Sequence, residues 1–262
     1  MSATVMSFCN QKGGVGKTST TALVSYNLSK LGYKTLVIDF DPQANITQLF
    51  LKTKTRGQSA VATINKSLMT VLQNEEPLTN AILSINENLD LIPSNINLSG
   101  AEIELVGIDD KEFILKGITD KLRRKYDYII LDCPPSLNML TINALTAATS
   151  VLVPIQCEYY ALEGLSQLIH TIDLVKERLN KRLKMEGVVF TMYDARTNLS
   201  LQVVENVKEN LNQNIYKTII PRNVRLAEAP SYGQPINIYD PRSAGAESYR
   251  LLAEEVLNRE DN

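Results

Sequence analysis

A glycine-rich segment near the N-terminus has the residue types and spacing to bind the phosphates of a nucleotide. Its sequence is Gln11-Lys12-Gly13-Gly14-Val15-Gly16-Lys17-Thr18-Ser19. It lies between a short apolar run and a helical pattern, so its glycines can turn backbone N–H groups toward phosphates at the helix N-terminus. We expect Lys17 to reach the β- and γ-phosphates and the Thr18 hydroxyl to bind Mg²⁺. A turn that only packs a helix on a strand does not require the Gly-Lys-Thr-Ser ending.

The start of this loop departs from the standard pattern. The standard loop has glycine at the place of Gln11, and here a second lysine, Lys12, follows it. On the residues alone, Lys12 also fits a solvated lysine beside an anion site.

Three carboxylates stand where two apolar, strand-like runs end. Asp39 ends the run 35–39, and Asp41 follows two residues later. Asp132 ends the run 128–132. The carboxyl ends of strands line the ligand crevice of α/β sheets, and residues two apart lie on one side of an extended chain. An apolar run that ends in a lone aspartate, as this one does at Asp132, is typical of a strand whose aspartate bonds a water molecule of Mg²⁺. Asp39 or Asp41 alone would also suit a solubilising turn.

Short β-branched or apolar runs alternate with longer helical patterns, as in a parallel sheet covered on both faces. Strands are expected at residues 4–8, 35–39, 89–92, 128–132, 151–154, 187–191 and 216–220. Helices are expected at residues 18–31, 111–125, 137–147, 162–183 and 201–212. The predicted fold is α/β, a mostly parallel twisted sheet with helices on both faces, in one domain spanning residues 1–262. The polar stretch 52–67 is expected to be a mobile insertion over the site.

Composition limits the partners. The chain of 262 residues is 44% hydrophobic and 21% charged, which fits a soluble globular protein. Its net charge of −2 gives no global basic field, so a nucleic-acid contact needs a local patch. A basic run either contributes to such a patch or is a charged helix end; it comprises Lys176, Arg178, Lys181, Arg182 and Lys184.

Cysteine and histidine usage excludes several kinds of site. Cys9, Cys133 and Cys157 form no CxxC pair, which argues against a disulfide framework or a zinc site. The single histidine, His170, excludes a His-based triad. No apolar run approaches the roughly 20 residues that span a bilayer, and no signal peptide is recognisable, so we expect a cytoplasmic protein.

Three motifs in order carry a family resemblance. The loop resembles the deviant Walker A pattern KGGxxK[ST], residues 39–43 resemble a DxDPQ first switch, and Asp132-Cys133-Pro134-Pro135 resembles a second switch. With residues 191–198 and 220–231, the chain resembles the ParA/Soj partition proteins, in the ParA/MinD branch of P-loop ATPases. The resemblance covers nearly the whole chain and is weakest at residues 52–111.

The resemblance implies roles for individual residues. ATP would bind Lys12, Gly13, Gly14, Val15, Gly16, Lys17, Thr18 and Ser19, with Pro221, Arg222 and Asn223 at the adenine. The catalytic residues would be Lys12, which reaches across a nucleotide-sandwich dimer, Lys17, which acts in its own subunit, and Asp41, which positions the attacking water. The Mg²⁺ shell would involve Thr18, Asp39 and Asp132. DNA would be contacted by Arg196 and Arg225, which otherwise suit solvated turns.

The implied function is partition of a plasmid or chromosome by an ATP-dependent homodimer. The dimer would bind DNA non-specifically at the nucleoid, and a ParB-type centromere-binding protein would stimulate its hydrolysis. The main alternative is a MinD-like membrane-associated positioning ATPase, which needs a basic amphipathic C-terminal helix. The acidic end, which includes Glu254, Glu255 and Glu260, would be repelled by anionic lipid, so no membrane partner is expected. A metabolic ligase or metallochaperone would need a second-substrate pocket or a cysteine pair.

Overall fold

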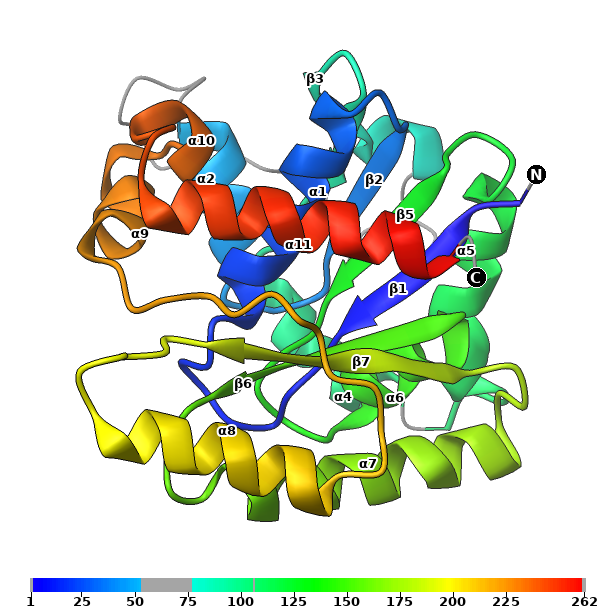
Figure 1. Ribbon diagram of the computed structural model, residues 1–262. Helices are drawn as coiled ribbons and strands as arrows, with labels where there is room; N and C mark the ends of the chain where they lie inside the picture. The colour runs from blue at the N-terminus through cyan, green and yellow to red at the C-terminus, as the bar shows by residue number, and fades with distance from the viewer. Residues whose placement is uncertain (1, 53–76, 106, 261–262) are drawn as a thin grey trace.

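The computed structural model describes residues 2–52, 77–105 and 107–260. Within these residues a sheet of seven strands has the order β3-β4-β2-β5-β1-β6-β7 (Figure 1). The strands are β1 (Thr4–Phe8), β2 (Thr35–Asp39), β3 (Leu83–Asn86), β4 (Leu89–Ile92), β5 (Tyr128–Asp132), β6 (Ser150–Gln156) and β7 (Lys184–Thr191). Neighbouring strands are parallel except for β3, which is antiparallel to β4. The prediction of a mostly parallel sheet is confirmed.

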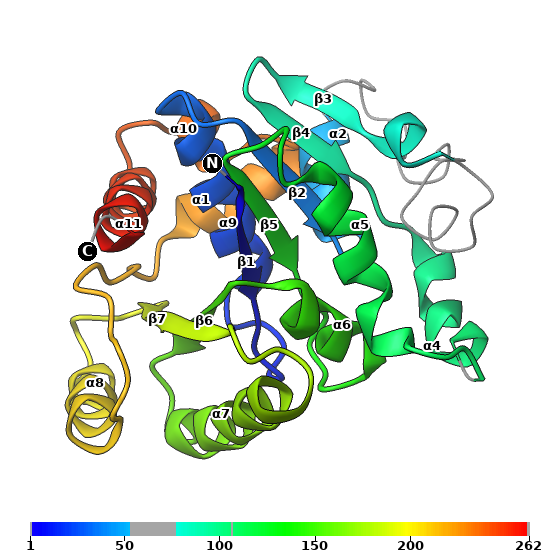
Figure 2. The same cartoon turned by 90° about the vertical axis from the view of Figure 1, so that its right-hand side faces the viewer.

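Helices cover both faces of this sheet (Figure 2). They are α1 (Lys17–Lys30), α2 (Asn45–Lys52), α4 (Ala101–Glu104), α5 (Ile114–Leu122), α6 (Met139–Ala147), α7 (Ala161–Arg178), α8 (Asn198–Asn210), α9 (Val224–Glu228), α10 (Ile236–Tyr239) and α11 (Ala244–Glu260). Successive side chains of a strand point to opposite faces. In β1, Val5 packs in the cluster that includes α5 to α8, whereas Met6 and Phe8 pack with α1 and α11. The strands are therefore buried on both sides, which explains their continuous apolar runs.

The prediction of a strand at residues 216–220 is wrong. Residues 216–220 run beside β7, but the segment joins it only through isolated bridges, Val188 to Ile215 and Tyr193 to Pro221. The backbone N–H groups of Lys217 and Thr218 donate instead to the Glu255 carboxylate of α11. A side chain thus satisfies the groups that a strand would pair with a neighbour.

Two other differences have local causes. The short antiparallel β3 was not predicted, and its register shifts between Ser84 and Asn86. Helix α7 ends at Arg178, five residues before the predicted end, because the chain turns at Asn180. The Asn180 amide donates to the carbonyls of Leu145 and Ala148, at the end of α6. The predicted insertion at residues 52–67 lies outside the described residues except for Lys52, which ends α2.

Candidate nucleotide-binding site

The phosphate loop connects the carboxyl end of β1 to the start of α1. Gly14 and Gly16 have φ angles of 76° and 83°, a left-handed conformation that side chains with a Cβ rarely adopt. Thr191, the last residue of β7, donates from its hydroxyl to the carbonyls of Val15 (2.8 Å) and Ile155 (3.0 Å). The loop is therefore held by the ends of three strands, and its backbone precedes the positive end of α1.

The two loop lysines lie in different surroundings. Lys17 is 6% exposed, and its ammonium donates to the Lys12 carbonyl at 3.0 Å. Burial lowers the pKa of Lys17, and the nearby charge of Asp132 partly opposes that shift. The Lys12 ammonium instead forms an ion pair with Glu158, two residues beyond the end of β6. The side chains of that pair are 43% and 42% exposed, so Lys12 lies at the rim and Lys17 inside.

Asp132 and Thr18 meet at the end of β5. The Thr18 hydroxyl donates to one carboxylate oxygen of Asp132 at 3.0 Å, and the Thr21 hydroxyl donates to the other at 2.9 Å. Asp132 is fully buried, and burial together with the charge of Asp39 raises its pKa well above the usual value. A hydroxyl and a carboxylate side by side are the hard oxygen donors that Mg²⁺ prefers, so these residues fit the predicted ion.

The side chains of Asp39 and Asp41 lie in different surroundings although the residues are two apart in the sequence. Asp39 is fully buried and accepts the backbone N–H and the hydroxyl of Thr47, at 2.9 Å and 2.6 Å. Burial raises the pKa of Asp39 to about 7 against these hydrogen bonds. Asp41 lines the pocket at the phosphate loop, and burial also raises its pKa, opposed by the Gln43 N–H and the Lys17 charge. The structure thus directs Asp39 to α2 and Asp41 to the phosphate loop.

Two adjoining pockets extend along this edge of the sheet. The phosphate pocket, of about 300 Å³, is lined by Gly13, Gly14, Gly16, Lys17, Thr18, Ser19, Asp41, Gln43, Asn45, Pro135 and Met192. The second pocket, of about 260 Å³ and mostly apolar, is lined by Gly16, Ser19, Thr191, Met192, Ile220, Pro221, Arg222, Asn223, Leu226, Ala227 and Tyr249. Three lining residues are common to both, so a ligand with phosphates and an apolar ring can occupy the two in sequence.

Several of these residues were missed by the sequence analysis. Glu158 follows the end of β6, and the same strand-end argument that selected Asp132 would have found it. Met192 follows β7 with a positive φ of 53°, which no local pattern indicated. Cys9 and Cys133, distant in sequence, follow neighbouring strands with their sulfurs 2.8 Å apart, and both are buried. No cluster of three or more metal-binding side chains occurs in the described ranges.

The two predicted DNA-contacting arginines lie on the surface, each paired with acids of its own chain. Arg196, in the loop after β7, donates to both carboxylate oxygens of Asp194 at 2.8 Å and 2.7 Å, and its side chain is 85% exposed. Arg225 on α9 pairs with Glu228 at 2.9 Å and lies 3.6 Å from Asp240. The guanidinium of Arg196 lowers the pKa of Asp194.

Comparison with known proteins agrees with this geometry. Residues 3–185 match the family described as an AAA domain. The chain is 51% identical to the sporulation initiation inhibitor protein Soj of Bacillus subtilis, over 96% of this chain and 97% of Soj. It is 47% identical to the chromosome partitioning protein ParA of Myxococcus xanthus, over 98% and 88%.

Solved structures show the same fold. Cobyrinic acid a,c-diamide synthase from Mycobacterium smegmatis, with a bound ATP analogue and magnesium, has a TM-score of 0.86 at 33% identity, over 99% of this chain and 96% of the synthase. A plasmid partition protein from Borrelia burgdorferi has a TM-score of 0.73 at 26% identity, over 93% and 100%. None of the helices that the structure describes is long and apolar enough to cross a bilayer. With its phosphate loop, strand-end carboxylates and full-length sequence similarity, the chain belongs to the ParA/Soj family of P-loop partition ATPases.

Proposed function

We propose that this partition ATPase hydrolyses ATP with Mg²⁺ and that its ATP-bound form is a face-to-face homodimer. The observation that carries the proposal is the contrast between the two loop lysines. Lys17 is buried within its own loop, whereas Lys12 is exposed at the rim and paired with Glu158. An exposed ion pair of this kind contributes only about 0–1 kcal/mol, so Lys12 can exchange Glu158 for a phosphate of a second subunit.

Each residue of the site has a role in this proposal. Lys17 and the loop N–H groups bind the phosphates, and the second pocket, with Pro221, Arg222 and Asn223, takes the adenine. Mg²⁺ would be held by Thr18 and, through a water, by Asp132, and it would neutralise charge on the β- and γ-phosphates.

The carboxylates of Asp41 and Asp39 have different roles in the proposal. Asp41, the carboxylate among the lining residues of the phosphate pocket, orients the attacking water. Asp39 supports the site indirectly, because its hydrogen bonds to Thr47 fix the start of α2. It would thereby hold the Asp41 segment beside the loop.

DNA binding is proposed for Arg196 and Arg225. Both arginines are exposed, and each forms its ion pair, with Asp194 or Glu228, at the surface. A DNA phosphate can replace the carboxylate there. A dimer doubles the number of arginines that one DNA segment meets, which offsets the overall net charge of −2. Association with the nucleoid and stimulation by a ParB-type partner complete the proposed cycle, supported by the names of the relatives.

A DNA-binding assay tests the proposal directly. Binding of unrelated DNA duplexes is measured with ATP, ADP and no nucleotide over a salt series. Arg225→Glu should lose at least about tenfold in affinity in ATP, equally for every duplex, because the contacts are to the backbone. Arg196→Glu should act similarly. The matched control is Arg250→Glu, another exposed arginine paired with glutamates, which should bind normally. Equal wild-type binding in ADP and ATP would contradict the proposal.

A further inference from the structure

A concavity of about 830 Å³ lies at the amino-terminal ends of the strands, opposite the nucleotide site. It is where β6 and β7 begin, at Ser150 and Lys184, which pair in the sheet. Figure 1 shows the end of α7, the start of β7 and the end of α11 on this same side. The eight residues of β7 separate the concavity from the phosphate loop by about 23 Å.

Four exposed cations line this concavity, which we call the basic pocket: Lys176, Lys181, Arg182 and Lys184. Within the described residues their side chains make no hydrogen bond or ion pair. The proposed DNA-contacting arginines, by contrast, are each paired with an acid. Glu186 is the acidic residue among those that line the pocket, and Arg259 adds a fifth base. The pocket is thus locally positive in a chain whose net charge is −2.

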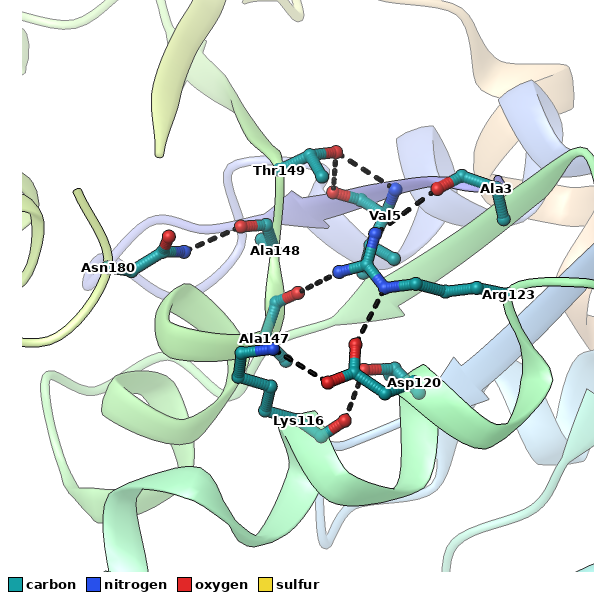
Figure 3. A network of polar contacts seen from close by, with 10 residues as sticks. Ala3, Val5, Lys116, Asp120, Arg123, Ala147, Ala148, Thr149 and Asn180 are labelled. Atoms are coloured by element: carbon teal, nitrogen blue, oxygen red, sulfur yellow. Dashed lines mark hydrogen bonds and ion pairs between the residues drawn. The ribbon is translucent and has the colours of Figure 1, made fainter. Parts of the chain in front are cut away.

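The backbone that carries these cations is fixed. Asn180 ties the turn after α7 to the end of α6, because its amide donates to the Leu145 carbonyl at 2.9 Å and to the Ala148 carbonyl at 2.7 Å. Figure 3 shows the bond to Ala148. On the other side of the turn, Leu183 is fully buried and the Lys184 N–H donates to the Thr149 carbonyl at 3.0 Å. Lys181 and Arg182 therefore project from an anchored turn, which lowers the ordering cost of binding a ligand.

The pocket also contains a polar group without a partner. Ser150 lines it and is 5% exposed, and its hydroxyl has no hydrogen-bond partner in the described part of the protein. The hydroxyl of the neighbouring Thr149 differs, since it exchanges hydrogen bonds with the backbone of Val5 (Figure 3). A buried hydroxyl is usually satisfied, so Ser150 leaves one unmet hydrogen-bonding group in the wall of the pocket.

A charged helix end explains only part of this arrangement. Lys176 lies in the last turn of α7, where a cation interacts favourably with the helix dipole. Lys181, Arg182 and Lys184 lie beyond the helix, on a turn and a strand, yet they line the same concavity. The helix dipole therefore accounts for Lys176 and not for the other three cations.

We propose that the basic pocket binds a compact, multiply charged phosphate anion, either an inorganic polyphosphate or a nucleoside polyphosphate. Its volume lies within the range of small-ligand pockets, and a concave wall suits a compact anion better than an extended duplex. The site lies far from the phosphate loop, so binding there requires neither ATP nor a second subunit.

The test uses inorganic tripolyphosphate and isothermal titration calorimetry on the full chain. Lys17→Ala serves as the background, because it weakens the phosphate loop. On this background, Lys181→Gln with Arg182→Gln should reduce tripolyphosphate affinity at least about tenfold, since two charged contacts are lost. The control is Lys121→Gln with Lys208→Gln, two lysines of α5 and α8 outside the pocket, which should change affinity less than about twofold. A nucleoside triphosphate measured beside tripolyphosphate decides which member of the class binds more tightly.

Two results would overturn the proposal. If the pocket variant and the control variant lose tripolyphosphate affinity equally, the effect comes from the overall charge of the protein and not from the pocket. Undiminished tripolyphosphate binding, combined with weaker DNA binding in both ATP and ADP, would make this surface a DNA contact instead. Circular dichroism of each variant checks that the fold is kept.

Discussion

At the carboxyl ends of the strands the charged groups inside the phosphate pocket are buried and bonded to neighbours. At the opposite ends the cations of the basic pocket are exposed and have no hydrogen-bonded or ion-pair partner among the described residues. Lys17 and Asp132 exemplify the first kind, with pKa values shifted by burial. Lys181 and Arg182 exemplify the second. Buried charges act strongly and at short range, because little water screens them, while exposed charges attract any anion and weaken with salt. The carboxyl edge therefore suits chemistry on one ligand, and the opposite edge suits reversible binding.

The largest effect is expected when the buried cation of the phosphate loop, Lys17, is removed. Lys17→Ala should lower ATP affinity by about 100-fold or more, because a phosphate loses a charge-assisted hydrogen bond inside a partly dry pocket. Lys208→Ala, an exposed lysine on α8, is the control and should bind ATP normally. Calorimetric titration of ATP in low and high salt measures both. A Lys17→Ala protein with near-normal affinity would place the phosphates elsewhere.

The next largest effect is expected at Asp41. Asp41→Ala should reduce turnover by about 50-fold while ATP affinity changes little, because the carboxylate orients water rather than phosphate. The variant should accumulate as a dimer in ATP, and its DNA complex should no longer decay. Phosphate release and light scattering report the two quantities. Asp173→Ala, an exposed carboxylate of α7, provides the comparison, and wild-type turnover in Asp41→Ala would exclude the role.

A moderate effect is expected for the rim ion pair. Lys12→Ala should bind ATP but raise the protein concentration needed for dimerisation by about tenfold or more, since the trans cation is lost. Glu158→Gln should shift that concentration the other way by about twofold to fivefold, because Lys12 is released from an exposed pair. Light scattering over a dilution series in ATP measures both variants. Normal dimerisation of Lys12→Ala would contradict the role across the interface.

The smallest effect concerns stability against pH. Burial raises the pKa of Asp39 in the folded protein to about 7, far above the usual value of an aspartate, so the folded state holds a proton that the unfolded state has released. Stability should therefore fall as pH rises from about 4 to about 7. Between pH 6 and pH 8 the loss from Asp39 is about 1 kcal/mol, or about 2–4 °C in Tm. Asp39→Asn should show a flatter pH dependence in magnesium-free and nucleotide-free buffer. An unchanged slope would show that the carboxyl ionises normally.

The sequence predicted the features that local patterns determine. The phosphate loop and the strand ends at Asp39, Asp41 and Asp132 follow from glycine spacing and apolar runs, and the structure brings Asp41 and Asp132 to the loop. The meeting of Cys9 with Cys133 depends on strand order, which no local pattern encodes.

Two differences depended on side chains from distant elements. Residues 216–220 have the composition of a strand, yet Glu255 of α11 accepts the N–H groups of Lys217 and Thr218. Apolar periodicity carried the prediction of α7 past Arg178, although the bonds of Asn180 to α6 turn the chain there. Because the competing partners are far away in sequence, propensity alone could not identify them.

The segment that runs beside β7 has a consequence for self-association. An open sheet edge offers unpaired N–H and carbonyl groups to any passing strand, which is a route to aggregation. Here the groups of Val188 and Phe190 are taken by Asn214, Tyr216 and Ile220, so the β7 edge is already occupied. At the other edge, β3 is only four residues long and irregular, which makes it a poor template. The proposed dimer therefore has to form through side-chain surfaces and not by extending the sheet, which leaves its assembly open to control by a bound ligand.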